Sequence, residues 1–246
     1  MEAKDIEQTL VLIKPDALKN SLTGYVLSQL SEFHTGLRFA AAKIVHVSTM
    51  LAGEHYAEHR EKFFYPSLLD YIQGKLHYPT DPGRRRVIAI VYQGPKAIGK
   101  VREIAGPTDP HVARAQQPGC IRSLGTIEQV KDAAGKVLGN RMDNLIHASA
   151  NPGDAEREIK LWFRPGDIPP AMHPYATATS AEHFYFKDGK LFADYSPGRV
   201  CVLAPGDLAW KTDLDTLQSI LKREKSASTV ESVVAKYLIN EQLEDT

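Results

Sequence analysis

The sequence predicts an α+β fold in which helices cover a mostly antiparallel sheet. Short apolar runs typical of strands alternate with segments of helical spacing, in the order strand, helix, strand, helices, strand, helix, strand, helix. Hydrophobic residues make up 43% of the 246 residues, which is enough for a packed core. The length allows one ordinary domain with a smaller addition, and the sequence shows no internal repeat.

The charge balance excludes a broad attraction to polyanions. Thirty basic residues balance 30 acidic ones, so we expect neither a nucleic-acid nor a membrane partner, and any phosphate binding must be local. Cys120 and Cys201 lie far apart without CxxC spacing, which fits a reducing compartment. The start of the chain is charged and lacks the apolar run of a signal peptide, and no apolar stretch reaches membrane-spanning length. These features predict a cytoplasmic protein.

The first third of the chain predicts two strands and three helices. Residues 9–13 form a continuous apolar run that stops at a proline, as expected of a buried strand. Residues 25–30 have helical spacing. Residues 37–47, rich in β-branched and small apolar side chains, predict a second strand. Residues 50–59 and 64–72 predict two helices joined as a hairpin.

The middle of the chain predicts a strand, a helix and a long loop. Residues 87–92 are the clearest strand of the sequence. Residues 95–105 predict a helix with a proline near its first turn. Residues 106–125 contain several prolines and glycines and are expected to be loop-like, and residues 126–134 predict an additional helix.

A boundary is expected near residues 164–170, where prolines and a glycine cluster. We therefore expect a first domain at residues 1–164 and a small α/β extension of unknown role at residues 165–246.

Within this extension, three elements are predicted. Residues 184–193 predict a β-hairpin that turns at an Asp-Gly pair. Residues 213–222 and 228–238 predict helices, the second starting with a capping box of Ser228 and Glu231.

One histidine is the best candidate for chemistry. Residues 144–147 predict a short strand that ends at His147, and residues 154–163 predict a helix that can carry Glu158 back over it. A carboxylate on one ring nitrogen fixes the tautomer and leaves the other nitrogen free to attack. With its unperturbed pKa of about 6.5, a histidine is largely neutral at neutral pH and is a competent nucleophile. For a histidine taken alone, a structural role at a strand end is the commoner case.

A near match to a phosphate-binding P-loop occurs at residues 94–101, after a predicted strand. However, Val101 stands where a hydroxyl should bind Mg²⁺, and Pro95 removes a backbone donor from the cradle. A surface turn that enters a helix is the better interpretation.

Two further motifs have simple alternatives. His55 and His59 match the H-x-x-E-H pattern of zinc enzymes, but no third ligand is evident. A solvated helix face is therefore the simpler interpretation, with a zinc hydrolase as an alternative. The three arginines at residues 84–86 can attract phosphate or nucleic acid, but an exposed loop ahead of a strand is the better interpretation.

Together and in this order, the motifs resemble the nucleoside diphosphate kinase family, over residues from about 7 to 163. The matching segments are residues 9–16, 55–59, 62–65 with Leu68, 106–110, 118–122, 144–149 and 155–159. The resemblance implies a ferredoxin-like antiparallel sheet with helices on its faces.

This resemblance implies a kinase that transfers the terminal phosphate from a nucleoside triphosphate to a nucleoside diphosphate by a ping-pong route. His147 is the implied phosphohistidine, oriented by Glu158 and Ser149, and Lys14 and Tyr56 are implied beside the transferring phosphoryl group. Such transfer depends mainly on positioning and on positive charge around the phosphoryl oxygens.

The family pattern also implies a set of nucleotide-binding residues. They are Lys14 and Asn144 at the ribose, Arg102, Thr108 and Arg122 at the phosphates, and Phe64 with Leu68 at the base. Because an aromatic stack tolerates every base, the expected substrates include ATP, GTP, GDP and CDP. The expected cofactor is Mg²⁺, held by the nucleotide phosphates and water without direct protein ligands. Since the family assembles as hexamers or tetramers, a homo-oligomer is expected.

Several departures from the family pattern leave an alternative open. The family usually has glycine at the position of Ala148 and aspartate at the position of Ala150. A methyl group at residue 148 could crowd the phosphate if the backbone there needs a positive φ. Residues 75–86 and 123–143 are longer than usual, and residues 165–246 lie outside the resemblance. The alternative is a catalytically weakened nucleotide-binding or scaffolding relative of the same fold.

Overall fold

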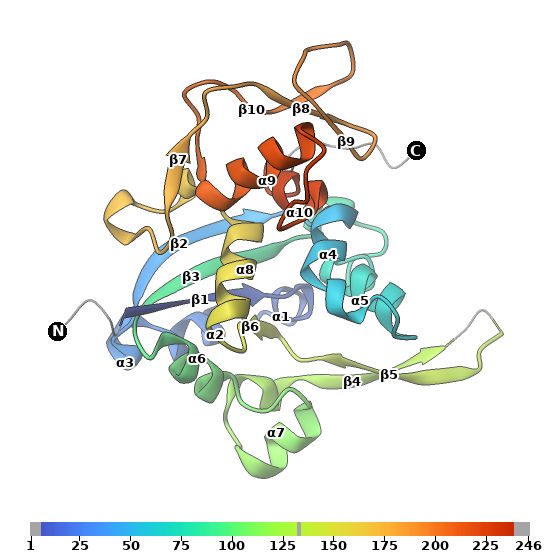
Figure 1. The fold of residues 1–246 in the computed structure, drawn as a ribbon. Helices are drawn as coiled ribbons and strands as arrows, with labels where there is room; N and C mark the ends of the chain where they lie inside the picture. The colour runs from blue at the N-terminus through green and yellow to red at the C-terminus, as the bar shows by residue number, and fades with distance from the viewer. Residues whose placement is uncertain (1–5, 132–133, 239–246) are drawn as a thin grey trace.

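A four-stranded antiparallel sheet forms the centre of the computed structural model, which describes residues 6–131 and 134–238 (Figure 1). The strands lie in the order β2-β3-β1-β6. Their bounds are Ile6–Ile13 for β1, Arg38–Val45 for β2, Val87–Pro95 for β3 and Ile146–Ala148 for β6. The predicted α+β class, a ferredoxin-like antiparallel sheet with helices on its faces, is confirmed.

Strand β1 is central because both of its faces are buried. Leu10 and Leu12 are completely buried on one face of the sheet, and Val11 and Ile13 are completely buried on the other. Side chains alternate between the two faces of a strand, so a continuous apolar run is what burial on both sides requires. β1 pairs with β3 along its whole length and with β6 at its C-terminal end, where Leu12 lies opposite His147.

Helices cover both faces of this sheet (Figure 1). α1, α2 and α6 pack on the face that carries Val11 and Ile13, and α4, α5 and α8 pack on the opposite face. The α-helices before the extension are α1 (Pro15–Lys19), α2 (Thr23–Gln29), α3 (Glu32–Thr35), α4 (Thr49–His55), α5 (Tyr65–Ile72), α6 (Ala97–Ala105), α7 (Pro110–Gln116) and α8 (Pro152–Trp162). Short 3-10 helices span Ala57–His59, Pro82–Arg84, Ile121–Leu124, Pro165–Asp167 and Pro170–Met172. Across residues 6–131 and 134–238, every helix falls short of the length and apolarity that a bilayer crossing requires.

The expected loop at residues 106–125 is only partly a loop. Pro110–Gln116 form α7, whose first turn is capped by the Asp109 side chain. The Asp109 carboxylate accepts hydrogen bonds from the backbone N–H groups of His111 and Val112. An aspartate followed by a proline at the first helical position is a helix start, and it outweighs the surrounding loop-forming residues.

The additional helix predicted at residues 126–134 is wrong. Thr126–Lys131 form strand β4, which pairs antiparallel with β5 (Val137–Asp143) in a separate two-stranded hairpin that projects from the sheet (Figure 1). Residues 132 and 133 lie outside the described residues. Thr126, Ile127 and Val130 are β-branched, and such side chains favour a strand once a partner segment lies beside them. The insertion expected at residues 123–143 is therefore largely this hairpin.

The C-terminal extension forms two small sheets and two helices above the main sheet (Figure 1). Its elements are β7 (Thr177–Thr179), β8 (Phe184–Lys187), β9 (Lys190–Phe192), β10 (Val200–Leu203), β11 (Leu208–Trp210), α9 (Lys211–Leu221) and α10 (Val230–Val234). β8 and β9 confirm the predicted hairpin. Asp188 and Gly189 have φ values of 49° and 72° there, as a tight turn of two left-handed residues requires.

The predicted capping box at Ser228 is wrong by one residue. Thr229 is the N-cap of α10, because its hydroxyl accepts a hydrogen bond from the backbone N–H of Ser232. Residues 1–5, which belong to the charged start of the sequence, and residues 239–246 lie outside the described residues.

Hydrogen bonds join the extension to the segment after α8, and one buried ion pair lies within the extension. The indole N–H of Trp210, fully buried in the core beside α8, donates to the carbonyl of Phe163 at 2.8 Å. Arg164 donates to the carbonyls of Lys236 and Tyr237. The ammonium of Lys236 lies 2.6 Å from the carboxylate of Asp213. Burial lowers the pKa of Lys236 and raises the pKa of Asp213, so each charge depends on its partner.

We expect Lys236→Met to destabilise the protein by about 3–5 kcal/mol, because it leaves the Asp213 carboxylate buried without its partner. Urea unfolding measures the change. Lys211→Met is the matched control, since Lys211 pairs with Asp215 at the surface of the same extension and such a pair is worth about 0–1 kcal/mol. Equal losses in the two variants would contradict the prediction.

Candidate active site

His147 lies in β6, and its ring is held by a carboxylate from α8. Its Nε2 lies 2.8 Å from Oε2 of Glu158. The helix begins immediately after the strand because the Asn151 side chain caps it, accepting a hydrogen bond from the N–H of Asp154, and Pro152 follows at the first helical position. This strand–turn–helix brings Glu158 back over His147, as the sequence predicts.

The Glu158 carboxylate is buried and fully ionised. Its Oε2 also accepts a hydrogen bond from the Ser149 hydroxyl at 2.7 Å, and the Ser149 oxygen in turn accepts one from the N–H of Leu10. Burial disfavours the charge, but His147 and the hydrogen bonds outweigh it and lower the pKa of Glu158 to about 2. An ionised carboxylate only accepts, so Nε2 of His147 carries a proton, and in the neutral ring Nδ1 keeps its lone pair.

A cleft of about 390 Å³ opens in front of His147. All the predicted site residues except Ser149 line it, whereas Ser149 is completely buried behind Glu158. Those residues are Lys14, Tyr56, Phe64, Leu68, Arg102, Thr108, Arg122, Asn144, His147 and Glu158. The structure thus brings together side chains from five separate segments of the chain.

Two of the cations that line this cleft, Lys14 and Arg122, are buried, whereas Arg102 is exposed. The Lys14 ammonium donates to the Asn144 side-chain oxygen at 2.6 Å, and burial lowers the pKa of Lys14 to about 8. Arg122 donates to the carbonyl of Gly106, and burial, reinforced by the charge of Arg102, lowers the pKa of Arg122 to about 10. Nε of Arg122 is buried without a partner among the described residues. Desolvated cations that repel one another are poised to bind an anion.

Part of the cleft lining is apolar and aromatic. Phe64 and Leu68 from the α4–α5 hairpin line it together with Met142 from the β4–β5 hairpin. The neighbouring Phe63 touches that hairpin so closely that a Cβ at Gly139 would lie 2.5 Å from its ring. The inserted hairpin therefore forms part of the cleft mouth.

Sequence reasoning missed His55 as part of the site. Its ring lies edge-to-face against His147, with 4.6 Å between the ring centroids, and it is buried. His59 instead stacks near Tyr56 from the following 3-10 helix. The two histidines of the H-x-x-E-H motif therefore do not converge as a zinc pair. The available signal was that His55 lies four residues after the buried Leu51, on the inward face of α4.

The P-loop-like segment does not form a phosphate cradle. The N–H of Ile98 donates to the Glu7 carboxylate, and Lys100 donates to the carbonyl of Thr35. This agrees with the predicted turn into a helix. The concern about Ala148 is also removed, because Ala148 lies in extended β6 and the positive φ of 68° belongs to Leu145.

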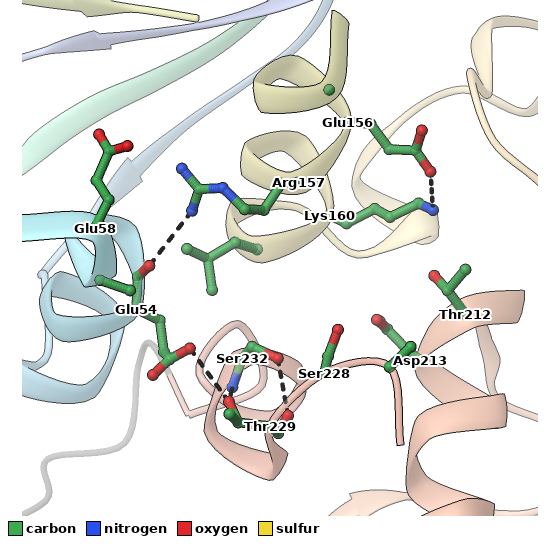
Figure 2. A pocket seen from close by; sticks show the side chains of 14 residues that line it. Glu54, Glu58, Glu156, Arg157, Lys160, Thr212, Asp213, Ser228, Thr229 and Ser232 are labelled. Atoms are coloured by element: carbon green, nitrogen blue, oxygen red, sulfur yellow. Dashed lines mark hydrogen bonds and ion pairs between the residues drawn. The ribbon is translucent and has the colours of Figure 1, made fainter. Parts of the chain in front are cut away.

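A second and larger cavity, of about 570 Å³, separates α4 and α8 from the extension (Figure 2). Most of its charged groups are already paired: Lys160 with Glu156, and Glu54 with the hydroxyl of Thr229. Glu58 and Arg157 line both cavities. No histidine or cysteine is among the described residues that line the larger cavity, so the His147 cleft is the candidate active site.

Comparisons with known proteins agree on one family. A family model described as nucleoside diphosphate kinase matches residues 7–168. The chain is 33% identical over 202 residues to a nucleoside diphosphate kinase of Thermococcus kodakarensis, covering 82% of this chain and 99% of that protein. It is 42% identical over 162 residues to one of Mycolicibacterium smegmatis, covering 65% of this chain and 96% of that protein.

Solved structures give the same result. A crystal structure of the Aquifex aeolicus nucleoside diphosphate kinase aligns with a TM-score of 0.53 and 32% identity, covering 67% of this chain and 99% of that one. A Borrelia burgdorferi nucleoside-diphosphate kinase, described as a transition state mimic with bound vanadate and ADP, aligns with a TM-score of 0.52 and 28% identity. It covers 70% of this chain and 95% of that one.

We expect Glu158→Gln to lose about 3 kcal/mol of stability at neutral pH, with the loss shrinking in acid. The folded-state pKa of Glu158 lies below its usual 4.5, so the carboxylate stabilises the fold above pH 4.5 and this stabilisation disappears as the pH falls towards 2. Urea unfolding at pH 7, 4 and 3 follows the difference between the proteins. Glu156→Gln, at an exposed position of α8, is the control. A gap between wild type and Glu158→Gln that does not change with pH would refute the assignment.

Proposed function

The chain belongs to the nucleoside diphosphate kinase family, and we propose that its phosphate transfer passes through a phosphohistidine at His147. Its activity is the transfer of the terminal phosphate from a nucleoside triphosphate to a nucleoside diphosphate. One observation supports His147 most: Glu158 holds Nε2, which leaves Nδ1 as the nucleophilic nitrogen at a cleft lined by buried cations.

The proposed reaction has two half-steps at this nitrogen. The lone pair of Nδ1 attacks the terminal phosphorus of a nucleoside triphosphate, and an N–P bond forms while the bond to the bridging oxygen breaks. The nucleoside diphosphate leaves with that electron pair. A terminal oxygen of a second diphosphate then attacks the same phosphorus, and the N–P bond breaks.

Glu158 and Ser149 orient His147 in this proposal. Forming the N–P bond places positive charge on the imidazole, and the ionised carboxylate 2.8 Å from Nε2 stabilises that charge without having to move. The Ser149 hydroxyl and the N–H of Leu10 fix the carboxylate in turn.

The cleft residues are proposed to bind the nucleotide along its length. Lys14 and Tyr56 lie by the transferring phosphoryl group, where the phenol stays protonated because burial and then Glu158 raise the pKa of Tyr56. The other proposed contacts are Arg102, Thr108 and Arg122 to phosphates, Asn144 with Lys14 to the ribose, and Phe64 with Leu68 to the base. Arginines can grip phosphate through two parallel hydrogen bonds.

We propose Mg²⁺ as the divalent ion that accompanies the nucleotide. The closest acid–histidine cluster of the described residues, His55, His147 and Glu158, offers two nitrogens and one oxygen, a donor set that suits Mg²⁺ poorly. The ion therefore fits best on the phosphates and water, where it neutralises charge.

We propose a broad nucleotide range, including ATP, GTP, GDP and CDP. The base end of the cleft is formed by Phe64, Leu68 and Met142, which offer apolar contact without a base-specific hydrogen bond.

We also propose a homo-oligomer. β2 is an edge strand, and Phe39 and Ile44 on it are exposed, Ile44 to 61%. An edge strand with exposed apolar side chains is a template for pairing with another chain.

The domain division and location are proposed on separate grounds. The family match ends at residue 168, close to the division proposed between residues 1–164 and 165–246, and the extension has its own apolar cluster around Phe184 and Leu217. Cys120 and Cys201 are free thiols, which supports a reducing compartment such as the cytoplasm.

We expect ATP labelled on its terminal phosphate to leave an acid-labile label on the protein that GDP or CDP discharges. His147→Ala should reduce this labelling by at least about a thousandfold, since the nucleophile is lost. His34→Ala, which removes an exposed histidine, should label normally. Labelling that persists in His147→Ala would disprove the mechanism. Binding of nucleotide without any label in the wild type would favour the weakened, nucleotide-binding or scaffolding relative.

We expect kcat/KM to fall above pH about 8 by about tenfold per pH unit, because Lys14 loses its charge there. The charge is present below that pKa and lost above it. Lys14→Arg, whose guanidinium stays charged, should show no such fall of kcat/KM above pH about 8, even if its activity is lower. If kcat/KM of the variant falls above pH about 8 as in the wild type, the ionisation belongs to another group.

A further inference from the structure

The catalytic histidine lies in a potential metal-binding cluster. His55, His147 and Glu158 each have a nitrogen or oxygen ligand atom within 4.8 Å of the others. Two imidazoles and a carboxylate are the donor set of many zinc sites, and imidazole also suits copper and nickel. An ion held here would occupy the group proposed to carry phosphate.

One hydrogen bond sets the tautomer of His55. The indole N–H of Trp162 donates to Nδ1 of His55 at 3.2 Å, and both side chains are buried. Indole nitrogen can only donate, so Nδ1 must accept with its lone pair. A ring whose Nδ1 accepts this hydrogen bond cannot be doubly protonated, so the imidazole of His55 is neutral. The proton of the neutral ring is therefore on Nε2.

Nε2 is the nitrogen of His55 that is free to meet a ligand. It is buried and has no partner among the described residues, and His55 lines the cleft. A metal ion needs the lone pair of Nε2, which would require the proton to move to Nδ1. Nδ1–H would then face the N–H of Trp162 at 3.2 Å, placing two donors together in a buried position.

We propose that Trp162 keeps transition metals off the active site by locking His55 as a hydrogen-bond donor. The lock leaves His55 as a neutral donor beside His147 and leaves Mg²⁺ on the nucleotide unaffected, because Mg²⁺ prefers oxygen ligands. The consequence for catalysis rests on the proposed role of His147. The metal chemistry itself depends only on the geometry of the cluster.

The test compares the two tryptophans of the chain. Trp162→Phe removes the N–H that fixes His55, and Zn²⁺ should then bind at least about tenfold more tightly in isothermal titration. Labelling by ATP, with Mg²⁺ held constant, should stop at Zn²⁺ concentrations that the wild type tolerates. Trp210→Phe is the matched control, since its buried indole donates to the carbonyl of Phe163 and should leave zinc sensitivity unchanged.

A double variant identifies the ligand. Trp162→Phe combined with His55→Phe should return zinc affinity to the wild-type value, since the ligand made available by the first change is removed by the second. Equal zinc affinity in the wild type and Trp162→Phe would overturn the proposal, as would tight binding by the double variant.

A measurement on the wild type covers the case in which Trp162→Phe does not fold. ¹⁵N NMR of the imidazole nitrogens reports the tautomer, and His55 should be neutral with its proton on Nε2. A proton on Nδ1 would overturn the proposal. Since zinc titration and NMR do not use phosphate transfer, failure of the phosphohistidine mechanism remains distinguishable from failure of this inference.

Discussion

The site depends on the hydrogen bond between Glu158 and His147, because that contact decides which ring nitrogen can react. The bond exists only because β6 pairs with the end of β1 while α8 folds back across the sheet. Ser149 connects α8 to β1, because its hydroxyl donates to the Glu158 carboxylate and accepts from the N–H of Leu10. The orientation of one imidazole is thus fixed by the central strand, and the β1–β6 pairing serves packing and chemistry together.

α8 links three parts of the molecule through different faces. Glu158 and Trp162 face the site, where they fix His147 and His55 respectively. Lys160 and Leu161 line the cavity beside the extension (Figure 2). The residue after the helix, Phe163, accepts the hydrogen bond from Trp210. The extension therefore packs on the helix that holds the ring of His147, although none of its described residues, 165–238, lines the cleft.

The central fold was predictable because its signals are local. Continuous apolar runs identified β1 and β3, and the helix predicted after the short strand placed Glu158 over His147. β4 was missed because it becomes a strand through its pairing with β5, and no pattern within residues 126–131 identifies that partner. The one-residue error at Ser228 has a similar cause, since Ser228 and Thr229 are both good caps and only the backbone decides between them.

The site was predictable where function constrains residue type, and not where packing decides. Lys14, Arg122 and Asn144 are polar residues near the ends of predicted strands or in a predicted loop, and they line the cleft. A family sequence pattern can therefore identify them. His55 looked like half of a solvated zinc motif, because nothing in the sequence shows that residue 162 meets residue 55 across the sheet face. That contact decides whether His55 is a ligand or a donor. The same sequence is therefore compatible with His55 as a metal ligand or as a hydrogen-bond donor. The partner of its Nδ1 decides between these two roles.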